Sequence, residues 1–143
     1  MIFKWVKSNE HVTYEEALAI RKAVFIDQQG IASDIELDGQ DHLYYHVVGY
    51  EDNTPLCTAR VKIEQGTLTV QRVAVMPNFQ GQGIGRQLMN EIKRFSKEKH
   101  VTEITLSAQH TAVAFYQSLN YDLIEGSEHI DADILHFDMK LTL

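Results

Sequence analysis

Hydrophobic and polar residues follow two different spacings along the chain, and the spacing changes several times. Residues 2–7 alternate with a period of two, which predicts a first strand. From Thr13 onward the apolar positions recur three and four apart, which predicts a helix whose inner face carries Ala17, Ile20, Val24 and Phe25. Thr13 and Glu16 form a capping-box pattern at the start of this helix, and Gly30 stands where the helix should end.

The middle of the chain predicts strands. Residues 31–41 are polar and irregular, and no regular element is expected there. Three apolar runs separated by turn-forming residues follow, and they predict an antiparallel meander of strands at residues 42–50, 56–64 and 67–76.

The last part of the chain mixes both spacings. A second helix is expected at residues 83–99, with one apolar stripe of Ile84, Leu88, Ile92 and Phe95. Residues 103–108 predict a strand, and residues 111–119 predict a short helix that turns Ala112, Phe115 and Leu119 inward. Closing strands are expected at residues 121–124 and 134–141. This order predicts an α/β or α+β fold, a mixed sheet with helices packed on it.

Length and composition indicate one globular domain. The chain has 143 residues and 44% hydrophobic residues, which suits a single core over residues 1–143. No apolar run approaches the roughly 20 residues that span a bilayer, and the N-terminus lacks the pattern of a signal peptide. The single cysteine, Cys57, excludes an internal disulfide. We therefore expect a soluble, cytoplasmic protein without a membrane partner.

The charges are unevenly distributed. The net charge of −7 argues against non-specific binding of nucleic acid. Acidic residues dominate at 10–52 and 122–138, whereas basic residues dominate at 86–100. A basic island in an acidic protein suggests an anionic ligand, and the acidic remainder favours a cationic one, although any single charge is best interpreted as solvated surface.

A glycine-rich turn carries the clearest chemical signal. The segment Gln80-Gly81-Gln82-Gly83-Ile84-Gly85-Arg86 lies between a predicted strand and a predicted helix. The first N–H groups of a helix are unpaired and partly positive, and glycines let an anion approach them, so this turn predicts a phosphate or pyrophosphate site. The P-loop pattern fails because no lysine follows the glycines, and the dinucleotide fingerprint fails because Arg86 stands where its last glycine should be.

The pattern Gln80-x-x-Gly83-x-Gly85 resembles the acetyl-CoA signature of the GNAT superfamily of N-acetyltransferases. Residues 72–75 resemble that family's central strand, and Ala112-x-x-Phe115-Tyr116 resembles a later helix, with Asn120-Tyr121 in place of the usual Gly-Phe. Residues 24–41 and His136 resemble the ElaA/YjcF-like branch. The resemblance covers nearly the whole chain and implies one N-acetyltransferase domain with a mostly antiparallel sheet and helices on both faces.

The resemblance also implies roles for individual residues. Backbone groups of Val73, Ala74 and Val75 would hold the pantetheine arm of acetyl-CoA, with the N–H of Val75 facing the oxyanion. The pyrophosphate would lie on the N–H groups of Gln82, Gly83, Gly85 and Arg86, where Gly81 and Ile84 shape the turn and Gln80 begins it. Arg86, or the pair Lys93 and Arg94, could meet phosphate charge. Tyr116 stands where the family's tyrosine acid protonates the leaving thiolate.

The general base is left open by the sequence. An amine with a pKa near 10.4 is almost fully protonated at pH 7, so a proton acceptor is useful. The candidates are Glu36, Asp38, Asp41, His42, His46, His110 and His136. His136 is the first choice on the substrate side, and Asp27 is the second. His42 and His46 should share a strand face, but no further ligand stands at a metal-site spacing, so no metal is expected.

The function predicted from the sequence is direct acetyl transfer from acetyl-CoA to a primary amine, and a small-molecule amine is preferred because the front half of the chain is acidic. Two alternatives stay open, namely transfer to amines of proteins or peptides and a non-catalytic acyl-CoA-binding sensor. Cys57 is interpreted as a small buried residue and not as an acyl-carrying nucleophile. The identity of the amine, the length of the acyl group and the presence of a homodimer are left open.

Overall fold

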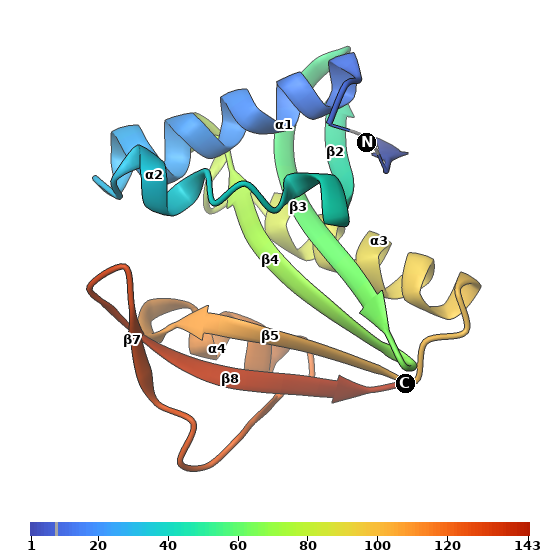
Figure 1. Cartoon of the computed structure of the whole chain (residues 1–143). Helices are drawn as coiled ribbons and strands as arrows, with labels where there is room; N and C mark the ends of the chain where they lie inside the picture. The colour runs from blue at the N-terminus through green and yellow to red at the C-terminus, as the bar shows by residue number, and fades with distance from the viewer. Residues whose placement is uncertain (8) are drawn as a thin grey trace.

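The computed structural model describes residues 1–7 and 9–143, and these residues form one twisted sheet of eight strands (Figure 1). Along the sheet the strand order is β1-β2-β3-β4-β5-β8-β6, and β7 pairs with β8. The strands are β1 Ile2–Val6, β2 Tyr45–Glu51, β3 Thr54–Glu64, β4 Thr67–Val75, β5 Glu103–Gln109, β6 Asp122–Leu123, β7 His129–Asp131 and β8 Ile134–Thr142.

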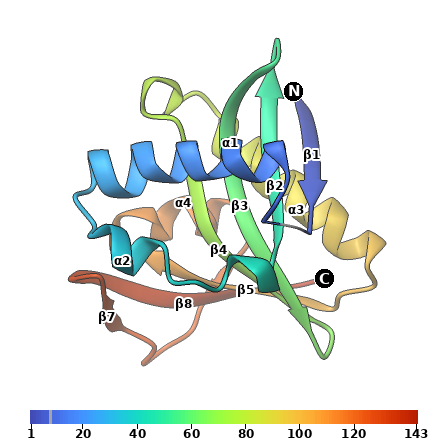
Figure 2. The ribbon, with the colours of Figure 1, turned by 45° about the horizontal axis from the view of Figure 1, so that its top comes forward.

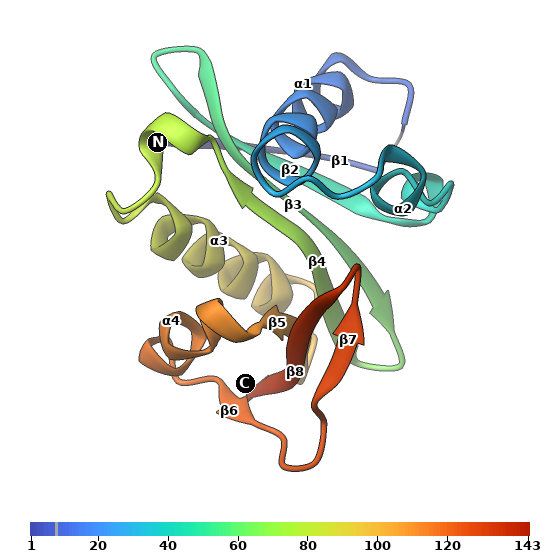
Figure 3. The same cartoon turned by 90° about the vertical axis from the view of Figure 1, so that its left-hand side faces the viewer.

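Helices cover both faces of the sheet, as Figure 3 shows. On one face lie α1 Val12–Arg21, its π-helical continuation η1 Lys22–Gln28, and the short α2 Ser33–Glu36. Helix α1 crosses strands β2 to β4 in Figure 2. On the other face lie α3 Ile84–Glu98 and α4 Val113–Ser118, and 3-10 turns occur at η2 Asp41–Leu43, η3 Pro77–Phe79 and η4 His110–Ala112. The mixed, mostly antiparallel sheet with helices on both faces confirms the predicted fold class.

The sheet opens in its middle, and this opening positions the site. Strands β4 and β5 are the parallel pair, and they pair only from Thr67 to Val70 on β4 and from Glu103 to Leu106 on β5. Beyond Val70 the two strands diverge, which is visible as a V between them in Figure 1. The last residues of β4 therefore have a partner on β3 but none on β5.

A β-bulge lies where β4 leaves β5. Thr58 pairs with Ala74 and Arg60 pairs with Gln71, so β4 carries one residue more than β3 across this interval. Arg72, inside the bulge, has a φ of 56°, which is uncommon for a residue with a side chain. A bulge bends its strand and increases its twist, which accounts for the divergence.

Each face of the sheet has its own apolar cluster. The larger one lies under α3 and α4 and contains the predicted stripe of that helix, Ile84, Leu88, Ile92 and Phe95. The smaller one lies under α1 and η1 and contains Ala17, Ile20, Val24 and Phe25, also as predicted. Both helical stripes are therefore confirmed.

Several local predictions are wrong. The N-cap of α1 is His11, whose Nδ1 accepts from Thr13 N–H at 3.0 Å, and Glu16 accepts from the Tyr50 hydroxyl and so does not complete a capping box. Strand β2 begins only at Tyr45, because residues 41–43 form a 3-10 turn, so His42 and His46 do not share a strand face.

In the short helix α4 the most buried side chain is Tyr116, which is 7% exposed and is not among the residues predicted to point inward. The three residues that are predicted to point inward are partly buried and pack against the larger apolar cluster: Ala112, Phe115 and Leu119. The strand β7 has no counterpart among the predicted elements.

Candidate active site

A cleft of about 1220 Å³ lies where the sheet opens. One wall consists of the end of β4, the glycine turn and α4, and the opposite wall consists of α2 and the loop after it. Strands β5 and β8 and the β7–β8 hairpin form the floor and the remaining side. Twelve residues are predicted from the sequence to hold the cofactor or to serve as the acid and the first-choice base. Eleven of these twelve line the cleft: Val73, Ala74, Val75, Gln80, Gly81, Gly83, Ile84, Gly85, Arg86, Tyr116 and His136. Gln82 does not line it, and its side chain donates to Asn78 O at 3.3 Å.

The glycine turn presents free main-chain donors to the cleft. Gly81 and Gly83 have φ angles of 76° and 83°, which glycine adopts without strain, and Gly83 is the N-cap of α3. Within the described part of the chain, the N–H groups of residues 81–86 donate to no protein acceptor. Several unpaired donors at the positive end of a 15-residue helix are suited to holding an anion.

The third glycine has a different task. A Cβ on Gly85 would lie 3.3 Å from Phe115 Cζ, so this glycine lets α3 and α4 approach each other closely. A Cβ on Gly81 or Gly83 would meet no protein atom within 4 Å, so at those positions the backbone angle and the open space matter. The three glycines therefore serve both ligand access and helix packing.

The end of β4 directs main-chain groups into the opening. Met76 N–H donates to Leu56 O on β3 at 2.8 Å. Successive residues of a strand direct these groups to opposite edges, so the N–H of Val75 faces away from β3 and toward the cleft. Val75 O faces the same way and accepts from Gln80 Nε2 at 3.0 Å. Gln80 thus orders the strand end with its side chain.

Two adjacent glutamines join the end of η1 to both sides of the opening. The side-chain amides of Gln28 and Gln80 exchange two hydrogen bonds, of 3.2 and 3.0 Å. Gln109 Nε2, at the end of β5, donates to Gln29 Oε1 at 2.9 Å. The C-terminal end of η1 is therefore bonded both to the glycine turn and to β5.

Tyr116 places a protonated phenol at the cleft. Its ring is 7% exposed and packs edge-on against Phe115 and Tyr121, with centroid distances of 5.0 and 5.8 Å. Burial raises the pKa of Tyr116 well above its usual value, so the hydroxyl keeps its proton at neutral pH. The group is suited to donating a proton and not to accepting one.

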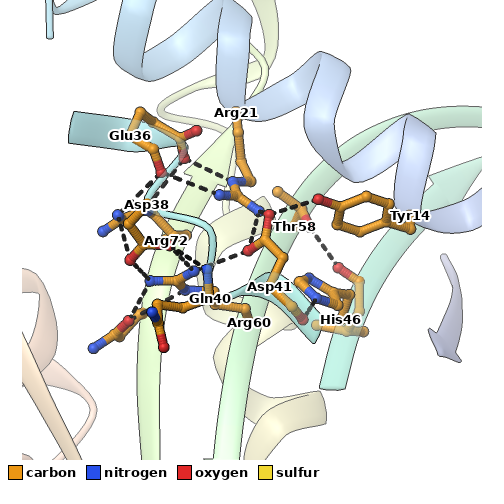
Figure 4. A network of polar contacts seen from close by, with 12 residues as sticks. Tyr14, Arg21, Glu36, Asp38, Gln40, Asp41, His46, Thr58, Arg60 and Arg72 are labelled. Carbon is orange, nitrogen blue, oxygen red and sulfur yellow. Dashed lines mark hydrogen bonds and ion pairs between the residues drawn. The ribbon is translucent and has the colours of Figure 1, made fainter. Parts of the chain in front are cut away.

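The wall formed by α2 and the loop after it, which we call the front wall, is held in place by ion pairs, shown in Figure 4. Arg21 contacts Glu36 at 2.7 Å and Asp41 at 2.9 Å, and Arg60 contacts Asp38 at 2.8 Å and Asp41 at 2.9 Å. We call the three arginines and three carboxylates the ion-pair network: Arg21, Arg60, Arg72, Glu36, Asp38 and Asp41. Its six formal charges cancel, and it ties residues 36–41 to α1, β3 and β4.

Arg72 joins the network from the bulge of β4. Its Nε lies 3.2 Å from Glu36 Oε1 without the geometry of a hydrogen bond, and its Nη2 donates to Glu36 O at 3.1 Å. Burial lowers the pKa of Arg72. The unusual φ of this residue is thus compensated by contacts on the opposite wall.

The network excludes several of the candidate bases. The hydrogen bond from Arg60 holds the pKa of Asp38 well below its usual range. Burial alone would raise the pKa of Asp41, but hydrogen bonds from Tyr14 and Arg21 and the Arg21 charge outweigh it and lower the pKa. Glu36 is 2% exposed and bonded to Arg21. Carboxylates stabilised in this way are weak bases.

The other candidates are no better placed. His46 is buried, which lowers its pKa, and its Nε2 contacts Asp41 O at 2.8 Å. His42 and His110 are exposed and do not line the cleft, and Asp27 pairs with Lys22 on the surface. Cys57 is fully buried, which raises the pKa of its thiol to about 11 and makes a thiolate nucleophile unfavourable.

The charge argument from the sequence needs a correction. The acidic segment 10–52 does not offer a field of free carboxylates, because Arg60 and Arg72 arrive from β3 and β4 to neutralise part of it. In the basic island, Arg94 is paired with Glu91 and Glu98, whereas Arg86 lines the cleft. Attraction of a cationic ligand by the front segment is therefore weaker than the composition suggested.

Sequence reasoning missed a polar cluster on the floor of the cleft. His136 Nδ1 lies 2.8 Å from Ile134 O, and its ring stacks on that of His129 at a centroid distance of 5.7 Å. His129 Nε2 lies 3.0 Å from Ser107 Oγ on β5. No short motif links Ser107 and His129, which lie 22 positions apart, and only the pairing of β5, β8 and β7 brings them together.

The described residues contain neither a side-chain cluster suited to a metal ion nor a helix suited to crossing a bilayer. Across residues 1–7 and 9–143, no group of three or more His, Cys, Asp or Glu side chains is arranged to hold a metal ion. No helix in the same residues combines the length and apolar character that crossing a bilayer requires.

Comparison with known proteins gives a consistent result. Residues 9–143 match the model of the acetyltransferase (GNAT) domain family. The chain is 26% identical to the uncharacterised N-acetyltransferase YjcF of Bacillus subtilis over 125 residues, which are 87% of this chain and 89% of YjcF. The crystal structure of Escherichia coli ElaA superposes with a TM-score of 0.84 at 23% identity, covering 98% and 99% of the two chains. PaiA N-acetyltransferase from Thermoplasma acidophilum, solved with coenzyme A, has a TM-score of 0.70 at 16% identity over 99% and 100%.

Proposed function

This chain belongs to the GNAT acetyltransferases, and from that premise we propose that it transfers an acetyl group from acetyl-CoA directly to a primary amine of a small molecule. Acetyl-CoA is the co-substrate of GNAT acetyltransferases. The observation that carries the proposal is the row of unpartnered N–H groups at residues 81–86, beside the opened edge of β4.

The cofactor is proposed to lie along this edge. Its diphosphate would accept hydrogen bonds from the amides of Gln82, Gly83, Gly85 and Arg86, and Gly81 and Ile84 would shape the turn around it. The pantetheine arm would run beside Val73, Ala74 and Val75 as an extra strand next to β4, where no neighbouring strand occupies the edge.

The chemistry follows from what surrounds the open strand end. The amine nitrogen attacks the thioester carbonyl, and the N–H of Val75 faces the place where negative charge develops on oxygen. The C–S bond breaks, and Tyr116 gives its proton to the departing thiolate. We place the proton acceptor for the amine on the β7–β8 hairpin, with His136 as the first candidate because it lines the cleft.

The shape of the cleft supports a small acceptor. Residues 31–41 cover one side, the β7–β8 hairpin covers another, and the Gln28–Gln80 and Gln29–Gln109 bonds connect the front helix to both sides of the opening. An extended peptide usually needs an open groove. The neutral ion-pair network gives no support for a strongly cationic acceptor, so shape and the cleft's few free polar groups are proposed to select the substrate.

The test is a panel of primary amines with acetyl-CoA, in which free thiol is measured and the acetylated products are identified by mass spectrometry. Release of thiol that depends on a small amine supports the proposal. Tight CoA binding without thiol release from any amine would instead indicate a sensor, and acetylated lysines or N-termini on added proteins would indicate a protein acetyltransferase. A parallel series with propionyl-CoA and butyryl-CoA reports the acyl length.

A further inference from the structure

Ser107 and His129 form a hydrogen-bonded pair that links the cleft to solvent. Ser107 lines the cleft, whereas His129 does not, and the side chain of His129 is 40% exposed. Ser107 Oγ and His129 Nε2 are 3.0 Å apart. Ser107 is the first residue of β5 beyond its last pairing with β4, so its hydroxyl lies where the opening begins.

The hydrogen bonds of His129 determine which of its nitrogens accepts. Nδ1 lies 2.8 Å from Ser127 O, and a carbonyl oxygen can only accept, so Nδ1 carries the proton. In the neutral ring Nε2 is then unprotonated and must accept from Ser107, whose hydroxyl donates. The Ser107 oxygen keeps its lone pairs for a donor in the cleft.

Several titratable groups lie around His129. Asp138 on β8 lies 3.9 Å from Nδ1, and the ring of His136 stacks on that of His129 at a centroid distance of 5.7 Å. Asp131 lies two residues further along the same strand.

We propose that the ammonium form of the acceptor amine is deprotonated through Ser107 to His129. An N–H proton of the ammonium moves to Ser107 Oγ while the Ser107 hydroxyl proton moves to His129 Nε2, which leaves Ser107 neutral and His129 as imidazolium. The neutral amine then forms the C–N bond, the C–S bond breaks, the thiolate takes a proton from Tyr116, and the amide nitrogen loses its extra proton to restore Tyr116. His129 returns its proton to solvent. This inference rests on the proposed amine acetylation, and it assigns the proton of the amine to Ser107 and His129 in place of His136.

The competing interpretation is that the Ser107–His129 bond only fastens the β7–β8 hairpin to β5, and that His136 alone takes the proton. The two interpretations predict different effects of the basicity of the acceptor amine on the rates of the variants. A missing proton acceptor matters only while the acceptor amine is protonated, whereas a loosened hairpin slows every acceptor at every pH.

The experiment compares Ser107→Ala, His129→Gln, the double variant and His136→Gln, with the amine that the wild-type protein acetylates fastest. Fluorinated analogues of that amine are less basic and are partly neutral at pH 7. Ser127→Ala serves as the structural control, since it removes a hairpin hydroxyl that contacts Asp138 N at 2.9 Å and lies off the proposed route. CoA affinity is measured for each variant.

If the proposal is right, Ser107→Ala and His129→Gln each lower kcat/KM at pH 7 by about 100-fold, the usual contribution of one acid–base group. The double variant falls no further, the loss shrinks with the less basic analogues, and the variants lose the dependence on pH between 5 and 8 that an imidazole produces. CoA affinity stays within about threefold of wild type. Nitrogen chemical shifts of His129 report the Nδ1–H form in the wild-type protein.

Several results would overturn the inference. One is a loss that is equal for all amines and pH values, as for Ser127→Ala. Another is an unchanged pH profile in Ser107→Ala and His129→Gln while His136→Gln abolishes it, and a third is an Nε2–H form of His129. Failure of the wild-type protein to acetylate any amine would remove the proposed function as well, so the two failures are distinct.

Discussion

The two walls of the cleft are built by opposite means. At the glycine turn, the main-chain N–H groups of residues 81–86 donate to no acceptor among the described residues. On the front wall, the six charged side chains of the ion-pair network are bonded to one another. One wall therefore keeps its polar groups free for a ligand. The other wall bonds its polar groups to one another and offers a ligand mainly a shape.

Breaking the front wall should have the largest effect. Arg60→Met removes the buried guanidinium that contacts Asp38 and Asp41, and removing one member of a buried ion pair costs about 3–5 kcal/mol. We expect this loss in the free energy of unfolding, measured with urea. Lys62→Met, which removes the partly exposed pair with Glu64 on the same strand, is the control and should cost less than about 1 kcal/mol. Equal losses in the two variants would show that the network contributes little.

Filling the glycine turn tests the opposite wall. Asparagine and aspartate both tolerate the positive φ of Gly83, so Gly83→Asn and Gly83→Asp differ mainly in charge. We expect Gly83→Asp to weaken CoA binding at least about 100-fold, or about 2.8 kcal/mol, and Gly83→Asn to weaken it about tenfold. Isothermal titration with CoA measures both. Similar affinities for the two variants would mean that no phosphate lies near this amide.

Tyr116→Phe tests the chemistry between the walls. Loss of the proton donor should lower kcat about 10- to 100-fold with little change in CoA affinity. Tyr121→Phe is the matched control, because its buried hydroxyl has no hydrogen-bond partner among the described residues and Tyr121 does not line the cleft. Removing an unsatisfied hydroxyl should leave both turnover and stability nearly unchanged. Equal turnover of Tyr116→Phe and wild type would exclude Tyr116 as the acid.

Acid should weaken the front wall with the smallest effect of the four. The pKa values of Asp38 and Asp41 are lowered in the folded state, so their contribution to stability is complete at neutral pH. It is lost as the pH falls below about 4, where the unfolded carboxylates bind protons first. Asp38→Asn should therefore unfold with a shallower dependence on pH in this range, and the exposed Asp34→Asn should not differ from wild type.

Features that depend on neighbouring residues could be predicted from the sequence. The stripe of α3 and the positive φ at Gly81 and Gly83 follow from local spacing and local backbone freedom. The order of the main strands followed in the same way. The face of α4 could not be predicted, because the burial of Tyr116 depends on Phe115 and Tyr121 together.

The acceptor side of the cleft depends on contacts between distant segments, which no local pattern in the sequence indicates. Arg60 and Arg72 reach Asp38 from strands more than 20 positions away, so a segment with few basic residues was interpreted as an open acidic surface. The same limit hid the pairing of Ser107 with His129. Cofactor sites made of consecutive amides leave a motif, and sites made of paired side chains leave none.

The extra residue in β4 changes the phase of the strand. Before it, Leu68 and Val70 pack under α3, and after it the odd-numbered Val73 and Val75 do so while Ala74 packs under α1. Deleting one residue of this bulge would therefore exchange the two faces of the strand end, so that Val73 and Val75 would face α1 and Ala74 would face α3. An alignment that omits the extra residue would match each residue of this strand end with a residue that lies on the opposite face of the sheet in a relative.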